Sequence, residues 1–139
     1  MNWLFKEEPA HYSFDALSRD GRTLWSGVKN PLAQMHLRAV RRGDRILYYH
    51  TGREKAIVGI ARAVGDARSD PGDRSGRRAA VEIAAVEKLP RAVSLREIKG
   101  MKMFAGFPLV RISRLSVMPV GDREWRAILR LSATSASAP

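Results

Sequence analysis

Cysteine is absent from the 139 residues of this sequence. Its absence excludes disulfide bonds, thiol nucleophiles, iron–sulfur clusters and zinc sites built on cysteine. Any nucleophile must therefore be another side chain. A chain without cysteine fits a reducing compartment.

Long apolar runs are missing as well. No run approaches the about 20 residues of a membrane-spanning helix. Residues 1–8 lack the basic start and apolar core of a signal peptide. We therefore predict a soluble, cytoplasmic protein with no membrane partner.

Motifs of catalysis and metal binding are also missing. The histidines His11, His36 and His50 lack the i, i+4 spacing of zinc-binding helices. Glu7 and Glu8 are neighbours at the end of a predicted strand, where successive side chains point to opposite faces and so do not pair. No G-x-S-x-G elbow or glycine-rich phosphate loop occurs, although a Ser-His-Asp arrangement stays open. The sequence predicts no catalytic residue, no metal and no cofactor.

Basic residues, in contrast, are abundant. The chain has 25 Lys and Arg against 14 Asp and Glu, and residues 21–62 have the densest excess, with nine basic and two acidic residues. Such an excess usually indicates a polyanionic partner. An Arg-rich proteome would produce the same balance, and that reading stays open. If the partner is nucleic acid, we expect four arginines of this segment to contact phosphate: Arg38, Arg41, Arg42 and Arg53.

The length suits one domain with a core of its own. We predict a monomeric domain over residues 1–132 and a disordered tail of small residues over 133–139. Helices are expected after the caps Ser13, Asn30 and Asp122, and at the capping box of Ser94 and Glu97.

Strands are expected over residues 3–5, 45–50, 56–64 and 78–86, with an interruption of the sheet at Leu89-Pro90. Gly59 marks a bulge or a close approach to the backbone. The short connections favour antiparallel pairing. The predicted fold class is α+β, a closed or nearly closed small β-barrel flanked by short helices.

Several of the ten aromatic residues lie beside polar residues at the ends of predicted elements. Trp25 precedes the turn before the second main helix, and Tyr48 and Tyr49 end a strand. We expect a pocket there, with Trp25 and one tyrosine as stacking walls. Its hydrogen-bonding groups would come from Lys6, Lys29, Asn30 and His50. The alternative is that Trp25 and Tyr48 are ordinary core residues, as we expect for Trp3 and Trp125.

A series of short motifs then occurs in order over residues 3–131. They are 3–9 (WLFKEEP), 12–17 (YSFDAL), 25–30 (WSGVKN), 40–44 (VRRGD), 48–50 (YYH), 57–61 (IVGIA), 86–90 (VEKLP), 93–95 (VSL) and 114–120 (RLSVMPV). Together they resemble the EVE domain family. The resemblance implies a PUA-like fold, a small mixed β-barrel with helices, related to the YTH and ASCH domains.

The same resemblance implies a non-catalytic reader that takes a modified base of DNA or RNA into an aromatic-walled pocket. Matched by motif, the pocket loop holds Trp25, Gly27, Lys29 and Asn30. The facing strand end holds Tyr49 and His50, and the rim holds Lys6 and Ser13. The sequence differs from the usual family pattern at residues 31–35, which read PLAQM, where the family usually has Tyr-Gln-Ala-Arg-Asn. This difference affects the expected contacts with phosphate or with the base edge.

Two other functions stay open at this point. A small-molecule or metabolite sensor would use the same pocket without a nucleic acid. An RNA-processing hydrolase of the ASCH type would need a catalytic lysine or carboxylate in the pocket, and Lys6 beside Glu7 is the candidate pair.

Overall fold

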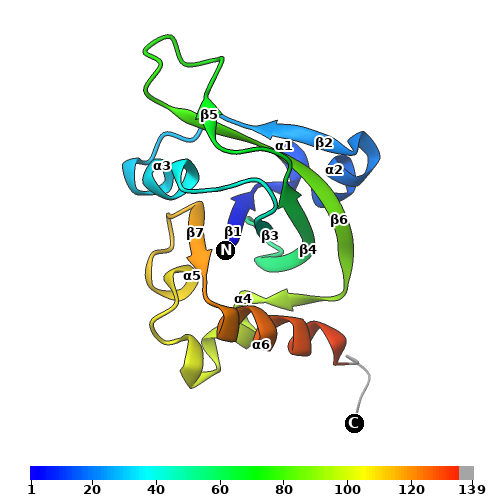
Figure 1. The fold of residues 1–139 in the computed structure, drawn as a ribbon. Helices are drawn as coiled ribbons and strands as arrows, with labels where there is room; N and C mark the ends of the chain where they lie inside the picture. Colours follow the sequence, from blue (N-terminus) through cyan, green and yellow to red (C-terminus); the bar gives the residue numbers. More distant parts are fainter. Residues whose placement is uncertain (135–139) are drawn as a thin grey trace.

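The computed structural model describes residues 1–134, and most of the predicted tail therefore lies outside the described residues. Seven strands form one mixed sheet with the order β2-β6-β4-β3-β1-β7, and β5 pairs with β6 (Figure 1). The strands are β1 (Asn2–Glu7), β2 (Arg22–Trp25), β3 (Arg45–His50), β4 (Ala56–Ala63), β5 (Arg68–Ser69), β6 (Ala79–Ser94) and β7 (Val117–Val120).

Short helices connect the strands. They are α1 (Pro9–Tyr12), α2 (Phe14–Asp20), α3 (Pro31–Arg38), α4 (Leu95–Lys99), the 3-10 helix η1 (Lys102–Phe104), α5 (Pro108–Arg111) and α6 (Asp122–Ala133). The predicted caps Ser13 and Asn30 and the Ser94–Glu97 capping box are confirmed. The cap predicted at Asp122 is wrong, because Gly121 is the cap and Asp122 begins the helix. Since α6 includes Ala133, the tail does not begin at 133.

The prediction of antiparallel pairing throughout is wrong for β1. This strand pairs in parallel with β3 and antiparallel with β7. Parallel strands need a crossover of a dozen or more residues, and the segment between β1 and β3 is long enough to hold α1, α2, β2 and α3. The mixed sheet that the family resemblance implies is therefore confirmed, because β1 has a parallel neighbour, β3, on one side and an antiparallel neighbour, β7, on the other.

The sheet is curved, but within residues 1–134 its pairing path stays open, with β2 and β7 at its two ends. The long strand β6 bends strongly around the molecule (Figure 1). Helix α3 packs against both β6 and β7.

The interruption predicted at Leu89-Pro90 occurs in the pairing but not in the strand, because β6 continues through Pro90 while no pairing with β4 is formed between Lys88 and Val93. The register between β4 and β6 shifts between Ile57 and Gly59, so Val93 pairs with Ile57 while Lys88 pairs with Gly59. Pro90 lies in the extra length of β6 created by this bulge. A proline is tolerated there because no ladder hydrogen bond is required from it.

Aromatic packing fixes the interior of the curved sheet. The Phe14 ring lies against Gly59, where an added Cβ would come within 2.5 Å of ring carbons. Phe14 also packs edge-on to Tyr48, with ring centroids 5.5 Å apart. The close approach predicted at Gly59 is therefore confirmed.

An ion pair ties the end of β6 to α4 and α6. The two terminal guanidinium nitrogens of Arg91 donate to the Glu97 carboxylate, at 2.9 and 2.8 Å, and Arg91 Nη2 also donates to the carbonyl of Leu131 at 2.8 Å. Bidentate pairs of this kind are stronger than ordinary surface pairs. The hydrogen bonds from Arg91 lower the pKa of Glu97 to about 2.

This pair predicts a pH-dependent effect of Glu97→Gln. A carboxyl whose pKa is lowered by folding stabilises the protein above its unfolded pKa of 4.5 and loses that effect as the pH falls towards 2. At pH 7 the variant should lose about 1–2 kcal/mol of unfolding free energy, after allowance for solvent screening. Urea unfolding from pH 7 to pH 2 measures it, with Glu87→Gln as the exposed control. An equal deficit at pH 2 and pH 7 would contradict the role of the ion pair.

Candidate nucleic-acid interface

A small cavity of about 190 Å³ lies at the end of β2. It is lined by Glu7, His11, Tyr12, Thr23, Leu24, Trp25 and Ser26. Pockets for drug-sized ligands are larger, about 300–1,000 Å³. The size of this cavity suits a flat group no larger than a single base.

Trp25 is both a wall of this cavity and part of the core. Its side chain is 6% exposed, with ring centroids 5.3 Å from Phe5 and 5.5 Å, edge-on, from Tyr48. Trp25 is therefore both a wall of the cavity and a core residue, which the sequence analysis treated as alternatives. Tyr48 itself is fully buried and is a core residue.

Polar groups accompany the aromatic walls. Glu7 Oε1 lies 3.1 Å from His11 Nδ1, and the Tyr12 hydroxyl donates to Asp20 at 2.8 Å. Burial and the hydrogen bond to Asp20 raise the pKa of Tyr12, which keeps this hydroxyl neutral. The cavity thus offers a carboxylate acceptor beside aromatic rings. Carboxylates pair with the exocyclic amino group of cytosine.

The loop after Trp25, residues 26–30, is held in place from both sides. Gly27 has a φ of +73°, and its N–H donates to Asp70 Oδ2 at 2.8 Å. Gln34 Nε2 donates to the carbonyl of Val28 at 2.7 Å, and Gln34 Oε1 accepts from the N–H of Ala79 at 2.8 Å. Asp70 and Gln34 are both buried. A loop anchored in this way presents a fixed rim to a ligand.

Two of the predicted pocket residues are helix caps in the structure. The Asn30 side chain accepts from the N–H of Ala33 at 3.0 Å, and Ser13 Oγ accepts from the N–H of Ala16 at 3.0 Å. Lys29 lies beside Asn30 and is exposed. These three residues border the loop and α2 and do not line the Trp25 cavity.

His50 uses both ring nitrogens inside the protein. Nε2 accepts from the N–H of Phe14 at 3.0 Å, and Nδ1 lies 2.7 Å from Glu54 Oε1. Since Nε2 is an acceptor, the proton of the neutral ring is on Nδ1 and points to Glu54. His50 therefore fixes the start of α2 against β3 and has no ring nitrogen left for a ligand.

Lys6 and Tyr49 lie on the other side of the sheet from Trp25. Phe5 packs against Trp25, and neighbouring side chains on a strand point to opposite faces. Lys6 pairs with Tyr49 across β1 and β3, with its Nζ 5.6 Å from the centroid of the Tyr49 ring. Both line a separate cavity of about 240 Å³. The structure thus divides the predicted pocket residues between two faces.

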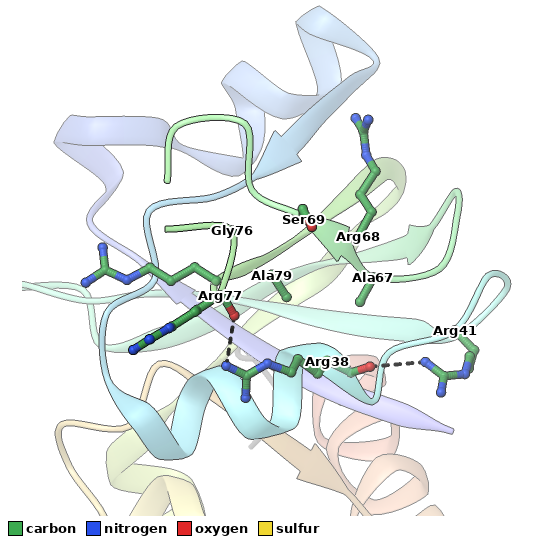
Figure 2. A pocket seen from close by; sticks show the side chains of 9 residues that line it. Arg38, Arg41, Ala67, Arg68, Ser69, Gly76, Arg77 and Ala79 are labelled. Atoms are coloured by element: carbon green, nitrogen blue, oxygen red, sulfur yellow. Dashed lines mark hydrogen bonds between the residues drawn. The ribbon is translucent and has the colours of Figure 1, made fainter. Parts of the chain in front are cut away.

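A third cavity, of about 470 Å³, is rich in arginine. Arg38 and Arg41 line it, as predicted for phosphate contacts, together with Arg68, Arg77 and Arg78. The labelled guanidinium groups extend in different directions, from α3, from the loop after α3 and from the β5–β6 region (Figure 2). Within residues 1–134 none of these five arginines forms an ion pair. Spread, unpaired cations suit contacts with several phosphates along a strand.

The other two predicted phosphate contacts lie outside this cavity. Arg42 is exposed just after Arg41, and its backbone N–H donates to Asp66 at 2.8 Å. Arg53 lines a separate cavity beside α4.

Sequence reasoning missed two groups of residues. One is the polar lining of the Trp25 cavity, Glu7, His11 and Tyr12, for which the only signal was their closeness to a strand end. The other is the arginine group of β5 and the β5–β6 loop, which consists of Arg68, Arg77 and Arg78. A run of basic residues around glycines in 68–78 was its signal.

No group of three or more His, Asp or Glu that would hold a metal ion occurs in the described part of the chain. Among the helices of residues 1–134, none has the length and apolarity needed to span a membrane.

A curved mixed sheet with short flanking helices is the architecture of a PUA-like fold. The model of the EVE domain family matches residues 1–131, and the chain belongs to this family. An ASCH protein from Zymomonas mobilis shares the fold more distantly, with a TM-score of 0.58 and 12% identity over 94% of each chain.

Relatives match along nearly the whole chain. A protein from Rhodopseudomonas palustris, solved by NMR, is 40% identical, with a TM-score of 0.91 over 95% of this chain and 92% of its own. Thymocyte nuclear protein 1 of Gallus gallus is 29% identical over 94% of this chain and 68% of its own. Human THYN1, solved in complex with DNA containing 5-methylcytosine, has a TM-score of 0.88 and 24% identity over 96% of this chain and 98% of its own.

Proposed function

We propose that this protein is a non-catalytic reader of nucleic acid that takes one modified base into the Trp25 cavity. The observation that carries the proposal is the combination of the Trp25 wall and the Glu7 carboxylate in a cavity of about 190 Å³. The carboxylate favours a base with an exocyclic amino group, which cytosine and adenine have. The complex of human THYN1 with 5-methylcytosine DNA supports the same class of ligand.

The arrangement of the loop supports a link between the cavity and the arginine group. Gly27, two residues after Trp25, donates to Asp70. Asp70 directly follows β5, whose residues Arg68 and Ser69 line the arginine cavity. The phosphates of a strand would lie on the arginines while one base enters the Trp25 cavity. The arginines supply affinity without sequence information, and the cavity supplies discrimination.

The energy balance favours single-stranded or weakened sites. A base must leave its stack to enter the cavity, which costs a few kcal/mol. Stacking on an aromatic side chain contributes about 1–3 kcal/mol per base. A base that is already unstacked avoids part of the cost.

The hydrolase alternative loses its candidate pair in this geometry. Glu7 lines the Trp25 cavity, whereas Lys6 lines the cavity on the opposite face. Because neighbouring side chains on a strand point to opposite faces, the two groups cannot act together on one bond, and of the pair only the Glu7 carboxylate lies in the Trp25 cavity. This placement supports a binding role.

The cytoplasmic location and the monomeric state stay predictions.

A panel of single-stranded oligonucleotides tests the proposed function. Each carries one central base, either cytosine, 5-methylcytosine, 5-hydroxymethylcytosine, adenine or N6-methyladenine, and fluorescence anisotropy measures Kd. Burial of one methyl group contributes about 0.8 kcal/mol, so one modified strand should bind about fourfold tighter than its unmodified match. Equal affinities across the panel would contradict the proposal. A free nucleoside that binds as tightly as its oligonucleotide would indicate a small-molecule sensor instead.

A further inference from the structure

Two adjoining cavities lie on the face of the sheet opposite Trp25. The first, of about 240 Å³, contains Lys6 and Tyr49, and the second, of about 430 Å³, contains Arg53 and Arg96. They share three lining residues: Lys55, Leu95 and Lys99. These shared side chains place both cavities between the β3–β4 loop and α4, and we treat the two cavities as one region. We call it the lysine groove.

The charge of the lysine groove is strongly positive. Its lining has five cationic side chains, Lys6, Arg53, Lys55, Arg96 and Lys99, against one carboxylate, Glu54. That carboxylate already accepts from His50 at 2.7 Å. Within residues 1–134 only this one acidic residue lines the groove, and an anionic ligand would offset the excess of positive charge.

Lys6 lines the first of the two cavities. Its Nζ donates to the carbonyl of Ser113 at 2.8 Å, which leaves two of its three N–H groups for other acceptors. The neighbouring walls include Leu95, Leu109 and Val110. Apolar walls strengthen the attraction between a cation and an anion. Burial lowers the pKa of Lys6.

Lys55 has an unusual backbone. Its φ is +45°, and among residues 1–134 it is the only non-glycine residue with a positive φ. Its carbonyl accepts from the N–H of Leu95 at 2.8 Å, which connects the β3–β4 loop to the start of α4. A lysine is strained in this region, where glycine and asparagine are the usual residues. Backbone strain of this kind gathers at ligand sites.

We propose that the lysine groove is a second ligand site, which binds a phosphate group among Lys6, Lys55 and Lys99. Two sources share this chemistry, a free nucleotide and the backbone of a bound nucleic acid. Lysine binds phosphate as a point charge and needs no bidentate geometry. The groove lies apart from the Trp25 cavity and shares no lining residue with it. The second site therefore does not depend on the proposed reading of a modified base.

Lys55→Gly is the sharpest test, because it removes the ammonium group and at the same time fits the left-handed backbone. Its melting temperature should stay within a few degrees of the wild type or rise. Lys99→Gln is a second variant that leaves the loop backbone unchanged. Arg130→Gln, on the exposed side of α6, changes the net charge by the same amount and is the control. Isothermal titration calorimetry and amide chemical shifts follow binding of inorganic phosphate, cytidine monophosphate and a single-stranded oligonucleotide.

If the source is a free nucleotide, Lys55→Gly and Lys99→Gln should each weaken phosphate and nucleotide binding about tenfold. If it is the backbone, both variants should lower the salt slope of oligonucleotide binding by about 0.7. Inorganic phosphate has no base, so it should bind Trp25→Phe as tightly as the wild type, which separates failure of this site from failure of the Trp25 cavity. Unchanged binding of all three probes in both lysine variants, or equal losses in Arg130→Gln, would overturn the proposal.

Discussion

Replacing Trp25 by alanine is expected to lower the free energy of unfolding by about 3–5 kcal/mol, as for other large aromatic residues in protein cores. The reason is that Trp25 is 6% exposed and packs against Phe5 and Tyr48. Such a loss is a large part of the about 5–15 kcal/mol that stabilises a typical domain. Urea unfolding followed by circular dichroism measures it. A loss below about 1 kcal/mol would show that Trp25 contributes little to the core.

Binding must be measured on a variant that keeps the core, and Trp25→Phe is suitable. The smaller ring retains part of the packing but loses stacking area in the cavity. We expect affinity for the preferred modified oligonucleotide to fall about fivefold or more, which corresponds to about 1 kcal/mol of stacking. Trp125→Phe is the matched control, because Trp125 is buried on α6 and lines no part of the cavity. An equal loss of affinity in both variants would indicate a general effect of destabilisation.

Charge reversal in the arginine cavity is expected to weaken binding to every oligonucleotide alike. In Arg41→Glu/Arg68→Glu, two cations that line the cavity are replaced by anions. If each contacts one phosphate of a single strand, the slope of log K against log salt should fall by about 1.4. Anisotropy titrations from 50 to 200 mM salt give this slope. The preference for the modified base should stay nearly constant, because the Trp25 cavity is shielded from the salt that screens surface charges.

Arg123→Glu/Arg130→Glu on α6 is the control for this prediction. It makes the same change in net charge at exposed positions of another element. If the two double variants lose affinity equally, net charge alone drives binding. If the preference for the modified base disappears together with affinity as salt rises, the Trp25 cavity does not discriminate.

The sequence predicted the local structure correctly where one short segment determines it. The caps Ser13 and Asn30 and the capping box of Ser94 and Glu97 follow from hydrogen bonds over three residues, and all are confirmed. Trp3 and Trp125 are buried as predicted. Gly59 was recognisable because a glycine inside an apolar strand leaves room for a neighbour, which is Phe14.

The sequence did not predict how strands that are distant in the chain pair with one another. The parallel pairing of β1 and β3 depends on a crossover that includes three helices, and no local pattern specifies it. Pro90 stays in β6 because a bulge against β4 removes the need for its hydrogen bond. The predicted pocket mixed Trp25 with Lys6 and Tyr49, because the sequence places them at strand ends without showing which face each side chain takes.

The motif resemblance identified the family correctly, and the model of that family matches residues 1–131. It could not separate contact residues from supporting residues. His50 belongs to a matched motif, yet its two nitrogens are occupied by Phe14 and Glu54. Asn30 likewise caps α3. Motif residues of this kind preserve the shape of the site, and Glu7 and Tyr12 line the cavity itself.

The most direct test of the account follows the methyl group of a 5-methylcytosine oligonucleotide by NMR. The methyl carbon is labelled with ¹³C, and its resonance is recorded with and without the protein. If the base enters the Trp25 cavity, ring currents should shift the methyl proton signal upfield, with nuclear Overhauser contacts to indole protons that disappear in Trp25→Phe. A bound strand whose methyl signal keeps its free position, or whose contacts are to Tyr49 instead, would contradict the account.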